Sequence, residues 1–209
     1  MVFGGTFDPV HIGHLRMATE LRCAVGVDVV HLMPCFQAVH KEVSATSADR
    51  LNMLALSIDG DSGLAIDKRE IRRNKPSFTY DSLRELRKEI STSPMLLVMG
   101  SDSVQNLPSW RHADAFSALT NLLVIRRPGV ENQDGCFIKK TLGLLGFSKA
   151  GKLRDLKKTE SGLYSELDLS ALDISSTEIR SLTQARKSIR YLVKDAVRQY
   201  ICDNELYRM

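Results

Sequence analysis

Several features that mark secreted, membrane and metal-cluster proteins are missing from this sequence of 209 residues. No apolar run reaches the roughly 18 residues of a membrane span, and no basic segment followed by an apolar stretch indicates a signal peptide. The few cysteines lie far apart without any CxxC pair, which argues against a zinc ribbon or a thioredoxin-like site. We therefore expect a protein of the reducing cytoplasm that has no membrane partner.

A strong charge of either sign is also missing. The net charge is only +4, and apolar residues make up 43% and charged residues 26%, as in globular rather than disordered chains. Such a mild basic excess suits anionic small-molecule substrates, although an ordinary solvated surface accounts for it equally well. It is too small and too scattered to predict a nucleic-acid partner.

What the sequence has instead is a repeated alternation of strand-like and helix-like patterns. Strands are expected at residues 1–3, 27–33, 64–66, 95–99 and 122–125, and helices at 12–25, 48–58 and 79–90. This succession predicts an α/β fold with a doubly wound parallel sheet, covered by helices on both faces. Ligands of such sheets bind beyond the carboxyl ends of the strands, so functional residues should follow them.

The rest of the chain carries weaker signals. Residues 130–166 give no clear pattern, and a helical portion starts at about residue 174. Because no repeat, low-complexity run or linker interrupts the chain, we expect a single domain over residues 1–209.

The segment 4–15, directly after the first strand, is the most informative. Gly4 and Gly5 let the backbone approach a ligand closely. His11 and His14 stand three residues apart where the next helix begins, which can place both imidazoles on one side of its first turn. A helix start also favours phosphate through its free N–H groups and dipole. Structural histidines or a metal-binding pair are alternatives, but no HExxH motif or obvious third ligand accompanies the two histidines.

This segment resembles the nucleotidyltransferases marked by an HxGH motif. Further blocks resemble those of bacterial nicotinate-nucleotide adenylyltransferases, to which the chain is similar over most of its length. In chain order they lie at 67–73 and 76–80, 100–103 and 108–110, 126–129, and 174–180. The resemblance implies a Rossmann-like nucleotidyltransferase fold. It also implies transfer of the adenylyl group of ATP to nicotinate mononucleotide, giving nicotinate adenine dinucleotide and pyrophosphate in NAD biosynthesis. The chain departs from the family's pattern at residues 37–41, where the two prolines before a His-Lys or His-Arg pair are missing.

The implied reaction requires positioning more than proton transfer. The acceptor's phosphate has a second pKa near ~6 and is already largely dianionic at neutral pH, so no general base is needed to make it a nucleophile. The task is to bring two anions together and to stabilise charge at the α-phosphorus. Mg²⁺ held mainly by the ATP phosphates would supply further positive charge.

The resemblance assigns roles to the residues of its blocks. His14 is expected to contact the α-phosphate and His11 to hold the triphosphate, with Lys41 and Arg180 as further cations of the catalytic site. Backbone N–H groups of the first loop and the start of the last block's helix are expected to bind phosphate, and Asp102 a ribose hydroxyl. The ATP-binding set is therefore Gly5, Thr6, Phe7, His11, His14, Gly100, Asp102, Ser176, Thr177 and Arg180.

The acceptor is expected to meet three residues. Trp110 can stack on the pyridine ring, a backbone N–H at Thr79 can hold the nicotinate carboxylate at a helix start, and Lys41 can reach its phosphate. Three of the assigned residues have a structural alternative: Trp110 can be a core tryptophan, Lys41 a solvent-facing lysine and Asp102 a helix cap. Ser175 and Glu178 likewise form a capping-box pattern that is structural by itself.

Other functions remain open on sequence alone. The acceptor can be nicotinamide mononucleotide or another phosphate, and phosphopantetheine adenylyltransferase is a related but shorter possibility. A non-catalytic nucleotide-binding regulatory module and a metal-dependent hydrolase belong to different classes. Retention of both His11 and His14 argues against the regulatory module. The partners expected are ATP and the mononucleotide, and homo-oligomerisation is left open.

Overall fold

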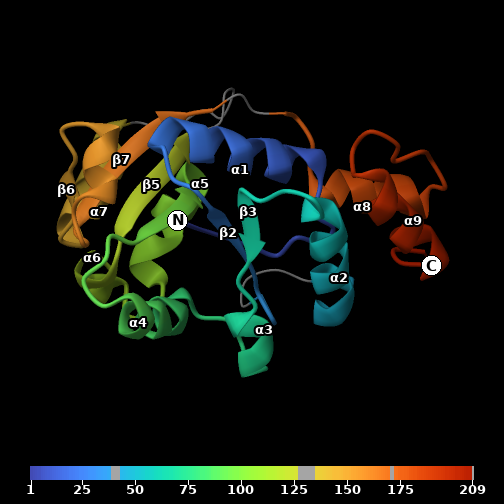
Figure 1. Ribbon diagram of the computed structural model, residues 1–209, viewed down its shortest axis with the longest axis horizontal. Helices are drawn as coiled ribbons and strands as arrows, with labels where there is room; N and C mark the ends of the chain where they lie inside the picture. The colour runs from blue at the N-terminus through green and yellow to red at the C-terminus, as the bar shows by residue number, and fades with distance from the viewer. Residues whose placement is uncertain (39–42, 127–134, 170–171, 209) are drawn as a thin grey trace. The chain divides into compact units, whose positions relative to one another are not determined.

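The computed structural model describes residues 1–38, 43–126, 135–169 and 172–208. Within them, seven strands form one sheet in the order β3-β2-β1-β4-β5-β7-β6 (Figure 1). The strand pairings are parallel, which confirms the α/β class and parallel sheet expected from the alternating patterns. The strands are β1 (Val2–Gly5), β2 (Val30–Pro34), β3 (Leu64–Ile66), β4 (Leu96–Gly100), β5 (Asn121–Arg126), β6 (Ser148–Lys149) and β7 (Leu163–Asp168).

The helices alternate with the strands along the chain. They are α1 (Ile12–Val25), α2 (Ser47–Ile58), α3 (Arg69–Arg73), α4 (Thr79–Ile90), α5 (Ser101–Asn106), α6 (Phe116–Leu119), α7 (Gly135–Leu144), α8 (Ser176–Gln184) and α9 (Asp195–Asp203). In the described part of the chain, none of them is both long and apolar enough to span a bilayer.

The described chain divides into two compact units. The first unit comprises Met1–Gly4, Arg22–Asp28 and Phe78–Ser170, and the second comprises Gly5–Leu21, Val29–Ser77 and Ala171–Met209. The single-domain expectation stays a prediction, and the two units are described separately below.

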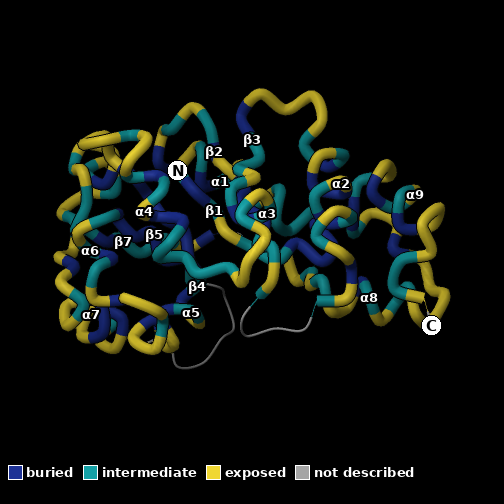
Figure 2. Tube along the Cα trace, turned by 90° about the horizontal axis from the view of Figure 1, so that it is seen from below, coloured by how far each residue is buried: buried dark blue, intermediate teal, exposed yellow. Residues whose placement is uncertain are grey.

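The first unit is built on buried parallel strands. Val98 of β4 pairs with Phe3 of β1 and with Leu123 of β5, so the carboxyl ends of these strands share one edge. The backbone of β4 and β5 lies in the buried interior (Figure 2). The first five residues of β5 are buried, and Arg126 at its end is partly exposed. Strands covered on both faces need apolar side chains throughout, which is why these segments read as continuous apolar runs.

The second unit packs α2 against the C-terminal helices. In Figure 1, α2 lies beside α8 and α9, and Tyr200 of α9 bonds to Asp49 and Asn52 of α2 at 3.0 and 2.9 Å. The helix expected at 48–58 is present as α2, and its apolar residues Leu51 and Ile58 are only partly buried. The buried face carries two polar residues and comprises Arg50, Met53, Leu54 and Ser57.

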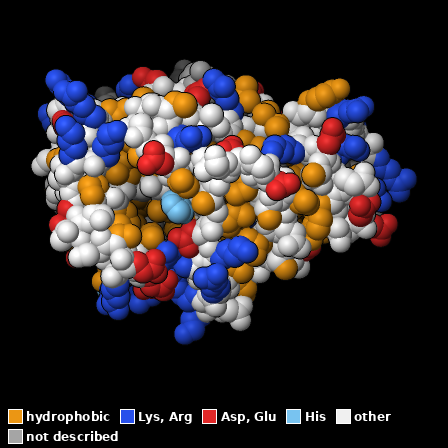
Figure 3. All heavy atoms as spheres, in the orientation of Figure 1, with side chains coloured by type: hydrophobic (Ala, Val, Ile, Leu, Met, Phe, Trp, Pro, Cys, Tyr) orange, Lys and Arg blue, Asp and Glu red, His pale blue; other side chains and the backbone are white. Residues whose placement is uncertain are grey.

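The basic side chains do not form one stripe on the face that Figure 3 shows. Lys and Arg occur there in separate groups, with acidic side chains between them. This matches a chain whose net charge is only +4.

Candidate active site

The loop after β1 is shaped by the buried ring of Phe7. This residue has φ 51°, in the left-handed region that non-glycine residues seldom adopt, and its side chain is 1% exposed. A Cβ on Gly5 would lie 2.8 Å from Cζ of that ring. Gly5 therefore leaves space for the Phe7 ring, which packs against it in the loop that leads to α1.

His11 and His14 lie against each other at the start of α1. Their ring centroids are 3.6 Å apart and the planes are tilted by 32°. The spacing of three residues thus places both imidazoles on one side of the helix start, as expected. Gly13 lies against the His11 ring, since a Cβ there would lie 3.0 Å from His11 Nδ1.

One ring nitrogen of His14 accepts a hydrogen bond from the backbone. The N–H of His11 donates to Nδ1 of His14 at 3.3 Å. A neutral imidazole that accepts at Nδ1 carries its proton on Nε2. His14 therefore presents an N–H donor on the ring side away from its own backbone, which suits an anionic oxygen.

Arg50 supports this loop from the interior and was not expected from the sequence. It is fully buried on α2, and its guanidinium donates to the backbone carbonyls of Thr6 at 2.8 Å and Phe36 at 2.7 Å. Buried cations need such partners. The signal in the sequence was an arginine at helical spacing with Met53, Leu54 and Ser57, on what proved to be the buried face.

The N-terminal end of α8 is tied to the same loop. Ser175 caps the helix by accepting from the Glu178 N–H at 3.1 Å, which confirms its structural role. The Ser176 hydroxyl donates to the Pro9 carbonyl at 2.9 Å, and Arg180 Nη1 donates to the Asp8 carbonyl at 2.8 Å. These bonds bring the last block of the sequence beside the first, within the second unit.

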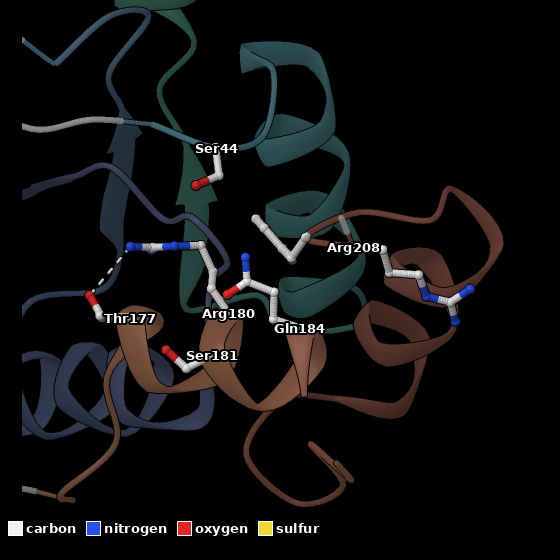
Figure 4. Close-up of a pocket in the computed structure, with 7 residues that line it drawn as sticks. Ser44, Thr177, Arg180, Ser181, Gln184 and Arg208 are labelled. Carbon is white, nitrogen blue, oxygen red and sulfur yellow. Dashed lines mark hydrogen bonds between the residues drawn. The ribbon is translucent and has the colours of Figure 1, made fainter. Parts of the chain in front are cut away.

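A cavity of about 410 Å³ adjoins this junction. In Figure 4 the Arg180 guanidinium points toward Thr177, to whose hydroxyl it donates at 3.4 Å. The lining is polar or charged, as a site for an anion requires. It consists of Ser44, Thr177, Arg180, Ser181, Gln184, Tyr207 and Arg208.

Gly100 and Asp102 belong to the first unit. Gly100 occupies the N-cap position of α5, which begins at Ser101. Asp102 is therefore an exposed residue inside the first turn, with its carboxylate against Gly100, and not the cap of the helix. Lys41 lies outside the described residues.

Thr79 and Trp110, also of the first unit, come from segments that touch. Thr79 is the first residue of α4, as expected. The next residue, Tyr80, packs on His112 with ring centroids 4.5 Å apart. Trp110 is only partly buried and meets the buried ring of Phe116 edge-on at 6.3 Å, so it is not enclosed in the core.

Comparison with known proteins agrees with this geometry. A parallel α/β sheet with paired histidines at the first helix start, and a second helix start bonded to the same loop, suits a protein that binds nucleotide phosphates. The family model described as cytidylyltransferase-like matches residues 2–182. A protein of Marinomonas sp. (strain MWYL1), named "Probable nicotinate-nucleotide adenylyltransferase", is 37% identical over 99% of this chain and 93% of its own.

Another relative and a solved structure are similar to this chain over nearly its full length. A Marinobacter nauticus protein of the same name is 38% identical over 96% of this chain and 93% of its own. The solved structure of Plasmodium falciparum nicotinic acid mononucleotide adenylyltransferase complexed with NaAD aligns with a TM-score of 0.75, covering 99% of this chain and 95% of that one, at 17% identity. The chain belongs to the nicotinate-nucleotide adenylyltransferases, within the cytidylyltransferase-like family, and is a nucleotidyltransferase.

Proposed function

We propose that the protein transfers the adenylyl group of ATP to nicotinate mononucleotide, giving nicotinate adenine dinucleotide and pyrophosphate for NAD biosynthesis. The observation that carries the proposal is the meeting of the histidine pair and the start of α8 on the loop after β1. The curated relatives carry the name of this activity, and the Plasmodium falciparum structure holds NaAD.

The second unit would bind the polyphosphate of ATP. The start of α8, with Ser176 and Thr177, offers N–H donors and a positive dipole end to phosphate oxygens. Arg180 adds a guanidinium beside them, and its side chain remains 26% exposed. His14 would donate from Nε2 to the α-phosphate as charge develops there, while His11 keeps the imidazole of His14 in that orientation through its backbone N–H.

No residue is assigned as a general base, because the acceptor's phosphate is already a nucleophile at neutral pH. The protein's part is to align the attacking oxygen with the α-phosphorus and to offset negative charge. Lys41 stays a predicted contact for these phosphates.

Magnesium would enter with ATP. Among the residues that the structure describes, no three His, Cys, Asp or Glu side chains are grouped to hold a metal ion. Mg²⁺ is usually bound through substrate phosphates and waters rather than by a protein cage, so the ATP phosphates would be its main ligands. When bound, the ion supplies positive charge to the phosphates. Location in the cytoplasm stays a prediction.

The first unit would recognise the acceptor. Trp110 has a partly exposed ring, and the segment that carries it touches the start of α4. An aromatic face and a helix N-terminus at Thr79 suit a pyridine ring with a carboxylate. A neutral carboxamide would use these donors less well, so the acid is the proposed acceptor.

Trp110→Ala should raise the KM for nicotinate mononucleotide by up to about tenfold and leave the KM for ATP within about twofold, because stacking on aromatic rings is worth roughly 0.5–1.5 kcal/mol. Trp110→Phe keeps a flat ring, so its KM for nicotinate mononucleotide should lie between those of the wild-type protein and Trp110→Ala. Steady-state kinetics with each substrate varied in turn measures this. Equal rises in both KM values, or a collapse of the melting temperature, would instead assign Trp110 to packing.

The proposal itself is tested by incubating the protein with Mg-ATP and either nicotinate or nicotinamide mononucleotide, and following pyrophosphate release. Release should depend on the mononucleotide, with a higher kcat/KM for the acid. Release without any acceptor would indicate a hydrolase. Tight nucleotide binding without release would indicate a regulatory module.

A further inference from the structure

The carboxylate of Asp8 is a buried junction between separate segments of the second unit. Its side chain is 3% exposed. The backbone N–H groups of Ser44 and Ala45 donate to it at 2.7 and 3.1 Å. The Tyr207 hydroxyl donates to Oδ1 at 2.8 Å across 199 positions of sequence. A buried carboxylate is stable only with such donors, so each one limits where Asp8 can lie.

Arg180 depends on the same residue. Its Nη1 donates to the Asp8 backbone carbonyl at 2.8 Å and lies 3.9 Å from Oδ2 of the carboxylate. Asp8 therefore sets the position of the guanidinium through both a hydrogen bond and charge attraction. A shift of Asp8 would move Arg180 relative to the helix start that carries Thr177.

Tyr207 reaches Asp8 from the C-terminal segment. The chain leaves α9 after Asp203 and places Tyr207 at φ 62°, a left-handed conformation that a bulky residue keeps only where its surroundings hold it. Burial, followed by the nearby Asp8 charge, raises the pKa of Tyr207 well above its ordinary value. The phenol thus remains protonated and able to donate at any physiological pH.

Tyr207 also lines the cavity beside Arg180. Figure 4 shows that the next residue, Arg208, points away from Arg180, and Arg208 pairs with Glu205 at 3.6 Å. Of these two lining residues of the C-terminal segment, Tyr207 is the one that bonds to Asp8.

We propose that Tyr207 is a positioning residue for ATP binding: its hydroxyl fixes Asp8, and Asp8 fixes Arg180 toward the polyphosphate. This inference rests on the proposed function, in which Arg180 binds ATP phosphates. Because Tyr207 acts through Asp8 and Arg180, its loss should weaken ATP binding without slowing the chemical step.

Tyr207→Phe keeps the ring and removes only the hydroxyl. We expect the KM for ATP, and the Kd for Mg-ATP measured by calorimetry without acceptor, to rise about tenfold, as for coupled neighbours in one hydrogen-bond network. The kcat and the KM for the mononucleotide should stay within about twofold, because a contact made equally in ground and transition states affects binding alone.

Tyr200→Phe is the matched control. Its hydroxyl bonds to Asp49 and Asn52 in the same unit, but not to Asp8. Both variants can lower the melting temperature, and only Tyr207→Phe should change ATP affinity. An unchanged Kd for Mg-ATP in folded Tyr207→Phe protein, or equal changes in both variants, would overturn the proposal.

A double-mutant cycle tests the route through Asp8. In an Asp8→Asn background, Tyr207→Phe should add little to the loss of ATP affinity, whereas full additivity would contradict action through Asp8. If Asp8→Asn does not fold, the comparison of Tyr207→Phe with Tyr200→Phe decides alone. A wild-type protein that releases no pyrophosphate with any mononucleotide contradicts the proposed function, while the ATP-affinity comparison still decides the role of Tyr207.

Discussion

His14→Ala should lower kcat by about 10²–10³ while the affinity for ATP stays nearly unchanged. The imidazole accepts at Nδ1 from the His11 N–H, so Nε2 is the ring nitrogen that would donate to a phosphate oxygen. Charge grows on that oxygen only as the new bond to phosphorus forms. Loss of one such preorganised donor has an effect of this size in comparable reactions, and it appears in kcat because the contact strengthens in the transition state.

The kcat, the metal content and the melting temperature, measured on one preparation, separate this catalytic role from a metal-binding or a packing role. His14→Asn can keep a donor and should lose less activity than His14→Ala. A metal ligand would lose bound metal together with activity, and a packing histidine would lose melting temperature. His31→Ala is the control, since His31 is an exposed histidine on β2 and should leave kcat unchanged. A normal kcat in folded His14→Ala protein would defeat the mechanism, even though the fold assignment would stand.

Arg180→Ala should weaken the use of ATP by roughly 1.5–3 kcal/mol, the range for a hydrogen bond to a charged group, which corresponds to about ten- to 150-fold in kcat/KM. The guanidinium lies beside Thr177 and the start of α8, where phosphate is expected. Because Arg180 also holds the Asp8 carbonyl, part of the loss would come from movement of the loop after β1.

Arg16→Ala serves as the comparison for this variant. Arg16 pairs with Glu20 on the surface of α1 and its side chain is 57% exposed, so its removal should change stability and ATP kinetics little. Kinetics with ATP varied, together with melting curves, measure both variants. If folded Arg180→Ala protein has the same ATP kinetics as Arg16→Ala, the arginine does not belong to the phosphate site.

The sequence predicted those parts of the fold that depend on local pattern. The bounds of α1, β3 and α4 coincide with the expected ranges, and the two helices carry apolar residues at helical spacing. Between residues 130 and 166 the pattern was unreadable. The structure has α7 there, together with β6 and most of β7. A strand of two exposed residues such as β6 leaves no periodic signal.

In the site too, the residues of local motifs were predicted, and the residues that act over long sequence distances were not. The histidine pair and the start of α8 were expected, since each is carried by a short motif with its own physical reason. The residues that hold these motifs together were not expected. Arg50 acts on Thr6 over 44 positions and Tyr207 on Asp8 over 199. Such bonds depend on how distant segments pack, and a single polar residue in a helix or a terminal tyrosine does not reveal its partner.

The transfer of the adenylyl group itself is tested most directly with labelled ATP. The protein is supplied with nicotinate mononucleotide and Mg-ATP labelled at either the α- or the γ-phosphate, and the products are separated and identified by mass. If the acceptor attacks the α-phosphorus, the α-label appears in a dinucleotide and the γ-label in pyrophosphate, in equal amounts. An α-label that remains in AMP or ADP, or a γ-label in free phosphate or on the acceptor, would contradict the account.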